Sequence, residues 1–211
     1  MENYIDTLHK SKLFASVSKE EIENILGCLD ASEVWFSKGD TVTLPSGTVG
    51  IIVDGNIQLH SSDGQQLYAY SQCDILCAEH VTVAMSLTAT ENCTVIILNE
   101  HKLLTVCSRS CLFHKTVIKN LFSIQASEIT ALMNRLHHIT KRTTREKLIS
   151  YFTQCAAESS SPVFEIACSR KQLAQYLCVD RSAMTTALYS LQEEGILKIS
   201  RNEIELLNMN K

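Results

Sequence analysis

Residues 168–197, CSRKQLAQYLCVDRSAMTTALYSLQEEGIL, contain two short amphipathic segments separated by a tight turn. Ser169, with Gln172 three residues later, forms a capping box that predicts the start of a first helix. Asp180 is a good N-cap for a second helix, which Gly195 is expected to end. Because only about three residues separate the two helices, they must cross steeply, as in a helix-turn-helix.

Apolar positions recur at helical spacing in both segments. They are Leu173, Ala174 and Leu177 in the first segment and Met184, Ala187, Leu188 and Leu191 in the second. The runs 196–200 and 203–207 then resemble two short strands around Arg201-Asn202, a small wing. A helix-turn-helix places its second helix in the major groove, so this pattern predicts binding to double-stranded DNA.

Composition sets the class of protein. With 211 residues, 45% of them hydrophobic, the chain can bury a real core in one or two domains. It has no apolar run of the roughly 18 residues that span a bilayer, and residues 1–6 lack a signal-peptide pattern, so we expect a cytoplasmic protein. Nine cysteines are an odd number in a chain of this size, which favours reduced, mostly buried thiols over a disulfide framework.

The net charge of −4 is unevenly distributed. Residues 1–140 contain nine Lys and Arg against fifteen Asp and Glu, whereas residues 141–211 contain ten against eight. The mild basic excess therefore lies in the part with the helix-turn-helix, where DNA phosphates would require it.

Between Val34 and Leu98, short β-rich runs alternate with turn residues, including the tight-turn dipeptides Asp54-Gly55 and Asp63-Gly64. This alternation of short strands and turns predicts a jelly-roll or a similar barrel. Two helices are expected before it, at 2–12 and 19–29. The expected strands are 33–36, 41–44, 49–53, 56–60, 66–70 and 94–98.

A long helix is expected at residues 114–140, where apolar residues follow the alternating spacing of a heptad seam. The seam is Ile118, Phe122, Gln125, Ile129, Leu132, Leu136 and Ile139. It favours a two-stranded dimer helix over a helix packed only within its own subunit. Gln125, the one polar member, would either fix the register or lie where the helices splay.

Three motifs in this order resemble the catabolite activator/FNR superfamily of bacterial transcription regulators, nearly end to end. They are the Lys38-Gly39-Asp40 turn, the IIVDGNI run at 51–57 and the SRKQLAQYLCVDRSA segment at 169–183. The resemblance implies an α+β protein with a jelly-roll, cyclic-nucleotide-binding-like sensing domain at 1–112, a dimerisation helix at 113–140 and a winged helix-turn-helix at 141–211. It further implies a homodimer on an inverted-repeat operator and, for an activator, RNA polymerase as a partner.

The chain departs from that superfamily at the effector site. Cyclic-nucleotide-binding members hold the ribose with a Gly-Glu pair and the phosphate with an Arg-Ser/Thr pair. Leu87 stands here where the arginine would be, and a buried phosphate without a guanidinium lacks its bidentate partner, so cAMP is not expected. Candidate residues for another effector pocket are Tyr68, Tyr70, Glu79, Leu87 and Thr88. Alternation along a strand equally accounts for the two tyrosines.

Metal cofactors are not expected either. Iron–sulfur members use clustered N-terminal cysteines, whereas the first cysteine here is Cys28. Cys107 and Cys111 would share one face of a helix, so metal or redox sensing is an open alternative. The simpler interpretation is that both cysteines are small, buried hydrophobic residues. Cys77 with His80 corresponds to the ligand region of haem-binding relatives, and haem is not expected. No metal ligands are assigned.

In a helix-turn-helix, the start of the second helix faces base edges, so Arg181 would contact guanine or a phosphate. Family members often carry a second Arg and a Glu on this helix, where this chain has Thr186 and Ser182. Base readout is therefore expected to be weaker or to use methyl and hydroxyl contacts. The candidate DNA-contacting residues, each otherwise a solvated surface group, are Arg170, Lys171, Arg181, Ser182, Thr185, Thr186, Lys198 and Arg201.

The sequence also bears on other classes of protein. An enzyme is not expected, because the sequence has no Gly-rich phosphate loop, no His-x-x-x-His or Cys-x-x-Cys metal spacing and no Gly-x-Ser-x-Gly elbow. The alternatives are a constitutive DNA-binding regulator whose sensor domain has lost its ligand, a redox- or metal-responsive regulator, and a dimeric co-regulator that no longer distinguishes base sequences. In the main hypothesis, an unknown effector in the roll changes the packing of the 114–140 helix.

Overall fold

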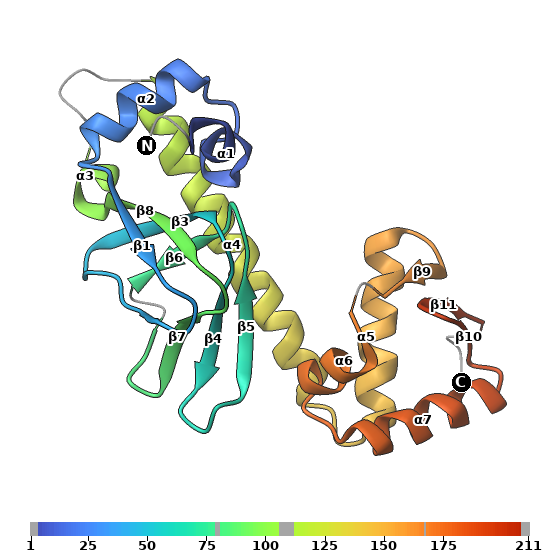
Figure 1. Ribbon diagram of the computed structural model, residues 1–211. Helices are drawn as coiled ribbons and strands as arrows, with labels where there is room; N and C mark the ends of the chain where they lie inside the picture. The colour runs from blue at the N-terminus through green and yellow to red at the C-terminus, as the bar shows by residue number, and fades with distance from the viewer. Residues whose placement is uncertain (1–3, 79–80, 106–111, 167, 208–211) are drawn as a thin grey trace. The chain divides into compact units, whose positions relative to one another are not determined.

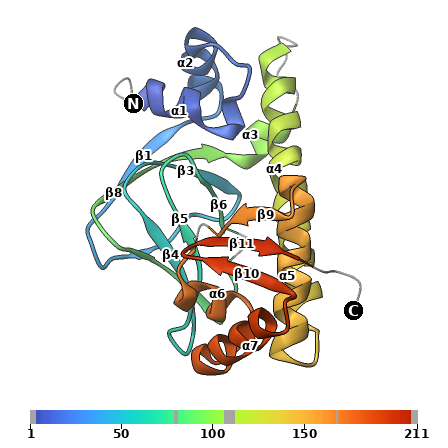
Figure 2. The same ribbon diagram turned by 90° about the vertical axis from the view of Figure 1, so that its right-hand side faces the viewer.

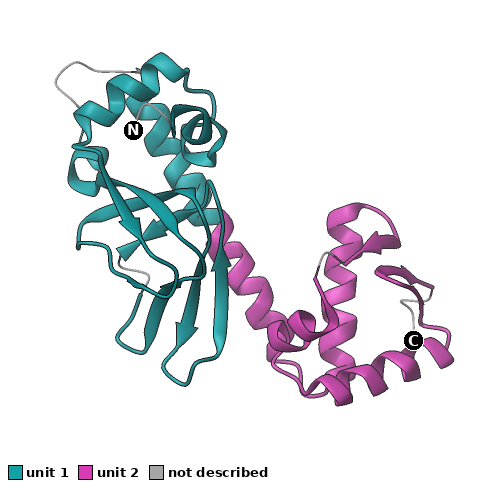
Figure 3. Cartoon of the chain, viewed as in Figure 1, with its two compact units in different colours: residues 1–126 teal, residues 127–211 magenta. Residues whose placement is uncertain are grey.

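The chain forms two compact units, residues 1–126 and 127–211 (Figure 3). Helix α4, Leu112–Ile139, contributes to both of them. The predicted division into a sensing domain, a dimerisation helix and a DNA-binding domain stays a prediction. The computed structural model describes residues 4–78, 81–105, 112–166 and 168–207. None of the described helices is long and apolar enough to cross a membrane.

The first unit opens with short helices: α1 (Ile5–Lys10), the 3-10 turn η2 (Lys12–Phe14) and α2 (Lys19–Cys28). The first is shorter than the helix expected at 2–12, because the buried Ser11 hydroxyl donates to the Leu8 carbonyl at 2.8 Å and the chain turns there. Helix α2 begins with a capping box, in which the Glu21 amide donates to Ser18 Oγ and the Ser18 amide to the Glu21 carboxylate.

Among the residues that the structure describes, eight strands then form two four-stranded antiparallel sheets, a jelly-roll that confirms the predicted fold class (Figure 1). The sheet orders are β1-β8-β3-β6 and β2-β7-β4-β5. The strands are β1 (Ser32–Phe36), β2 (Thr41–Val42), β3 (Thr48–Asp54), β4 (Ile57–Ser61), β5 (Gln66–Tyr70), β6 (Ile75–Cys77), β7 (Met85–Ala89) and β8 (Cys93–Asn99). A strand is present at each expected position, although β2 ends at Val42 and not at residue 44, and β6 and β7 were not predicted.

The central strands β3 and β8 are buried on both faces. Ile51 of β3 and Ile96 of β8 belong to a core shared with α1, α2 and the start of α4. Ile52 and Val95, one residue away, point into the space between the two sheets, where Leu87 also lies. Because side chains alternate across a strand, a strand covered on both sides is apolar throughout, which explains the IIV and VIIL runs.

Helix α3 (Glu100–Leu104) precedes α4, whose N-terminal half is anchored in the first unit. Val117 and Leu121 of α4 are buried in the core there. The Asn120 amide donates to the carbonyls of Leu13 and Ala15, at 2.9 and 2.8 Å, and so ties the helix to η2. The predicted long helix is confirmed.

The second unit packs helices against a small antiparallel sheet in the order β10-β11-β9, whose strands lie side by side in Figure 2. The apolar residues predicted on the two helix-turn-helix segments meet α5 and the wing in one core. The elements are α5 (Thr144–Ser159), β9 (Val163–Glu165), α6 (Arg170–Tyr176), α7 (Arg181–Glu193), β10 (Leu197–Ser200) and β11 (Glu203–Leu206). The wing is confirmed, and β9 was not predicted.

The turn between β3 and β4 requires a glycine. Gly55 has a φ of +84°, and a Cβ there would lie 2.5 Å from both the Asn92 carbonyl oxygen and Cys93 Cβ. Gly64, between β4 and β5, has a nearly equal φ of +82°, but a Cβ there would meet nothing within 4 Å. The two positions therefore share the backbone strain that a side chain would suffer and differ in the space available to it.

We predict that Gly55→Ala lowers the free energy of unfolding by about 3 kcal/mol, and Gly64→Ala by about 1 kcal/mol, because only the first substitution adds a clash with backbone to the strain. Urea denaturation of the two variants measures both losses. Equal losses would show that the close approach at Gly55 relaxes without cost.

Candidate DNA-binding surface

The helix-turn-helix is built on the caps that the sequence predicted. The Ser169 amide donates to Gln172 Oε1 at 2.8 Å, and the Gln172 amide donates back to Ser169 Oγ. Asp180 Oδ1 accepts the amides of Ser182 and Ala183 at 2.8 and 2.9 Å. The Ser182 hydroxyl, followed by these two amides, holds the pKa of Asp180 below its ordinary value, because each donor stabilises the carboxylate.

The turn between α6 and α7 is stabilised from outside by Lys147 of α5. Its ammonium donates to the carbonyls of Leu177 and Cys178, at 3.2 and 3.3 Å, where the last carbonyls of α6 lack helical partners. Cys178 itself is left-handed, with a φ of +51°. The sequence does not predict this role of Lys147, because no local pattern links Lys147 to carbonyl groups thirty positions later.

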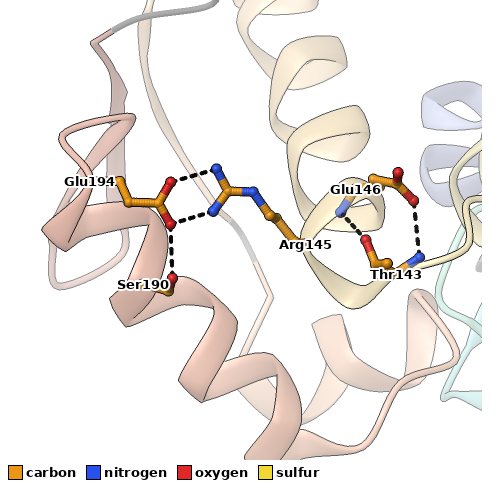
Figure 4. A network of polar contacts seen from close by, with 5 residues as sticks. All are labelled: Thr143, Arg145, Glu146, Ser190 and Glu194. Carbon is orange, nitrogen blue, oxygen red and sulfur yellow. Dashed lines mark hydrogen bonds and ion pairs between the residues drawn. The ribbon is translucent and has the colours of Figure 1, made fainter. Parts of the chain in front are cut away.

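The far end of α7 is held by Arg145, also on the first turn of α5 (Figure 4). Its two terminal nitrogens reach the two oxygens of Glu194 at 2.6 and 2.7 Å, and the Ser190 hydroxyl donates to the same carboxylate. These donors, Arg145 first, lower the pKa of Glu194. The capping box of Thr143 and Glu146, also in Figure 4, starts α5 at this point.

Most of the predicted DNA-contacting side chains are exposed. Lys171, Arg181, Ser182, Thr186, Lys198 and Arg201 are exposed, whereas Arg170 and Thr185 are half-buried. The hydroxyl groups of α7 donate to the protein itself: Thr186 to the Ser182 carbonyl and Ser182 to Asp180. Each hydroxyl therefore presents lone pairs, which accept hydrogen bonds, toward solvent.

A cleft of about 440 Å³ brings part of this set together. It is lined by Arg170, Arg181, Thr185, Leu188, Tyr189, Gln192 and Ile199. Arg170 Nη1 is buried and has no hydrogen-bond partner among the described residues. Sequence reasoning missed Tyr189 and Gln192, which follow Arg181 and Thr185 at helical spacing and could have been found by extending that row along α7.

Most residues of the predicted dimer seam are exposed, both in the part of α4 before residue 127 and in the part after it. Phe122 is 66% exposed and Leu132 64%, and Ile129 and Leu136 are exposed as well. Ile118 and Ile139 are half-buried. Gln125 is half-buried, and its amide donates to the Cys77 thiol of β6 at 3.5 Å.

The last turns of α4 are packed onto the helix-turn-helix. Arg135 Nε donates to the Tyr176 carbonyl at 3.1 Å, and the guanidinium lies over the Tyr176 ring. His138 is 1% exposed; its Nδ1 lies 2.8 Å from the Ser150 hydroxyl and its ring contacts Tyr151 edge-on. This end of α4 therefore contacts both α5, through His138, and α6, through Arg135.

The candidate effector residues are spread over the roll. The rings of Tyr68 and Tyr70 contact each other on one face of β5, with centroids 4.7 Å apart. Leu87 is buried in the core between the sheets, and Thr88 is half-buried on β7. Glu79 lies outside the described residues, as do His80, Cys107 and Cys111. In the described part of the chain, no group of three or more His, Cys, Asp or Glu side chains is placed to hold a metal ion.

Comparison with known proteins agrees with this architecture. Residues 146–211 match the Crp-like helix-turn-helix domain family. No curated protein matches the chain significantly.

Solved structures with the same fold include CprK(C200S) complexed with OCPA, with 20% identity, a TM-score of 0.65 and 90% of each chain covered. A CooA mutant from Carboxydothermus hydrogenoformans has 16% identity and a TM-score of 0.55, with 94% of this chain and 96% of that one covered. The c-di-GMP-responsive regulator CLP of Xanthomonas campestris has 12% identity and a TM-score of 0.54, covering 89% and 98%.

We predict that Cys178→Gly raises the free energy of unfolding by about 0.5–1 kcal/mol, because glycine adopts a φ of +51° without the strain of a Cβ. Cys178→Ala is the matched control: it removes the thiol, keeps the Cβ and should give no gain. Chemical denaturation of both variants makes the comparison. An equal gain in both would assign the effect to the thiol rather than to the backbone.

We predict that acidification weakens the second unit through His138. Burial lowers the pKa of this imidazole below its ordinary value of 6.5, an effect that nearby His137 and Lys141 reinforce and Gln154 and Glu158 oppose. The unfolded chain therefore binds a proton more readily than the folded one, and stability falls as pH drops through about 6.5. Melting temperatures at pH 7.5 and 5.5 measure this loss.

The control for this prediction is His138→Gln, which cannot titrate. Its melting temperature should change less than that of the wild-type protein between the two pH values, although its absolute stability is lower at pH 7.5. The same change in both proteins would show that other groups cause the pH dependence.

Proposed function

We propose that this chain, a CRP/FNR-type DNA-binding transcription regulator with a Crp-like helix-turn-helix domain at residues 146–211, binds an inverted-repeat operator as a homodimer under the control of an effector in its roll. The observation that carries the proposal is the helix-turn-helix itself. Its two helices are capped as predicted, and Arg181, Ser182 and Thr186 are exposed at the start of α7. That is the part of the second helix that faces base edges in this motif.

The homodimer is supported by the apolar stripe on α4. Phe122, Ile129, Leu132 and Leu136 are large and exposed, and Met133 beside them is 60% exposed. A monomer that left such a stripe in water would be prone to association, whereas a second α4 with the same heptad spacing would cover it. A two-fold dimer places its recognition helices about 34 Å apart, one turn of DNA, so the operator should be an inverted repeat.

Control by an effector is supported by the bond between Gln125 and Cys77. It links α4 to the strand that leads into the segment where superfamily members bind their effectors. Two arrangements of α4 are then possible, one with the bond between Gln125 and Cys77 and one without it. A ligand would change the packing of α4 only if it bound these two arrangements with different affinity. Because Leu87 fills the arginine position and is buried, the effector should not be a cyclic nucleotide.

A second candidate is a constitutive regulator whose roll binds no ligand. The observation in its favour is the apolar packing between the sheets, where Ile52, Leu76, Leu87 and Val95 are all nearly fully buried. Such a protein would bind its operator equally well with and without small molecules.

The deciding experiment measures binding of the purified, reduced protein to the DNA upstream of its own gene, against scrambled competitor, at two salt concentrations. We expect salt-sensitive binding that survives the competitor. Binding that the competitor abolishes at both concentrations would contradict sequence-specific regulation by the free protein. The same assay with added metabolites separates the regulated protein from the constitutive one.

We predict that Leu132→Lys dissociates the dimer and weakens operator binding, because it places a like-charged pair in the seam. Ala131→Lys is the matched control, since Ala131 is also exposed on α4 but lies outside the seam. Sedimentation velocity gives the oligomeric state, and circular dichroism confirms that both variants are folded. A dimer that persists in Leu132→Lys would exclude this seam as the interface.

A further inference from the structure

A buried titratable residue, His138, lies where α4 meets the helix-turn-helix. It is one residue before the end of α4, and only 1% of it is exposed. Its ring contacts Tyr151 of α5 and Tyr176 of α6, with ring centroids 5.7 and 6.4 Å away. Because Tyr176 is the last residue of α6, this joint borders the turn of the helix-turn-helix.

The site suits a neutral imidazole and not a charged one. Nδ1 of His138 lies 2.8 Å from the Ser150 hydroxyl, whereas Nε2 is buried and has no partner that satisfies hydrogen-bond geometry among the described residues. A neutral ring needs an acceptor for one N–H group, which Ser150 can supply, but an imidazolium needs acceptors for two. Protonation would therefore bury a charged N–H group without an acceptor.

The charged neighbours of His138 do not compensate for its burial. Burial is the largest cause that lowers the pKa of this ring, and His137 and Lys141 lower it further. From α5, Gln154 and Glu158 raise it. Glu158 is exposed, however, and its carboxylate already accepts a hydrogen bond from Gln154 at 2.6 Å. The balance is a pKa below the ordinary value of 6.5.

The two tyrosines at the joint add no negative charge. Burial raises the pKa of Tyr151 and of Tyr176, so both hydroxyl groups stay protonated where histidine titrates. The Arg135 guanidinium, 5.3 Å from the centroid of the Tyr176 ring, brings a further cation to the joint. The packed arrangement thus binds a proton more weakly than one with His138 in water, and acid favours the second.

We propose that the proton is a regulatory ligand of this chain: protonation of His138 releases the last turn of α4 from α5 and α6, which lowers the affinity for the operator. The proposal rests on the homodimeric DNA-binding function proposed above and names one effector of it. Arg135 Nε donates to the Tyr176 carbonyl at 3.1 Å, and Arg135 and His138 are three residues apart. The two contacts therefore hold the same turn of α4 to the motif.

Release would leave each helix-turn-helix folded. Its core is formed by residues of α5, α6, α7 and the wing, and among the described residues it includes none from α4. In a dimer, however, the two helix-turn-helix motifs would no longer be held one turn of DNA apart. We therefore expect acid to weaken binding to an inverted repeat and to spare binding to a single half-site.

The test compares two duplexes at pH 7.5 and pH 5.5. One contains the inverted repeat from the DNA upstream of the protein's own gene, and in the other, half of that repeat is scrambled. The preference of the wild-type protein for the complete repeat should fall by as much as about tenfold, because one proton is bound with an ordinary affinity after release. In His138→Gln, which cannot titrate, this preference should not change with pH.

The matched control is His137→Gln. His137 is also titratable and is next to His138 in sequence, but it is exposed. This variant should show the same loss of preference as the wild-type protein. Circular dichroism at both pH values should show that the helices of all three proteins remain formed.

Hydrogen exchange detects the release without DNA. From pH 7.5 to pH 5.5, after correction for the intrinsic exchange rates, the last turn of α4 should lose protection in the wild-type protein and keep it in His138→Gln. The amides of α7 should be equally protected in both proteins. Unchanged protection of α4 in the wild-type protein would overturn the proposal.

The remaining outcomes separate this proposal from the DNA-binding function. If the wild-type protein and His138→Gln lose the same preference, His138 is not the sensor. If both duplexes lose affinity together with helical content, the second unit unfolds instead of releasing α4, and the proposal is again overturned. If the wild-type protein binds neither duplex at either pH, the proposed DNA-binding function fails, and hydrogen exchange alone decides whether protons release α4.

Discussion

Two cations on the first turn of α5 fix both ends of α7. Lys147 holds the carbonyls that precede α7, and Arg145 holds the carboxylate that follows it. The Arg145–Glu194 ion pair is at the surface and adds little to stability, whereas Lys147 is half-buried. The energy comes from the apolar face beneath, where burial of residues such as Met184, Leu188 and Leu191 contributes about 1.5–3 kcal/mol each. The apolar core therefore supplies most of the stability of α7, and the two polar contacts tie its ends to α5.

Helix α4 is anchored at both of its ends by different chemistry. Its N-terminal half is held by apolar burial and by the amide of Asn120, and its C-terminal turns by Arg135 and the buried His138. The exposed apolar stripe runs between these anchors. In the proposed homodimer, this stripe is the surface that a second copy of α4 would cover.

Local patterns predicted the elements well and the long-range contacts poorly. The caps at Ser169 and Asp180 and the strand β5 were found because each depends on neighbours within a few residues. The strands β6 and β9 have three residues each, too few to show a period. The bonds of Lys147 and Arg145 and the shared cleft of Arg170 and Arg181 join residues distant in sequence, which no spacing rule connects. The partner of Gln125 was missed for the same reason.

The two central strands of the roll impose an order on folding. Strand β3 is among the most apolar segments of the chain, and its neighbours in the sheet are β6 and β8. During synthesis β3 leaves the ribosome well before residues 93–99, so an uncovered, aggregation-prone edge exists until β8 arrives. The sheet β1-β8-β3-β6 can therefore close only after β8 has been synthesised, and slow translation between β3 and β8 would lengthen the interval in which this edge is uncovered.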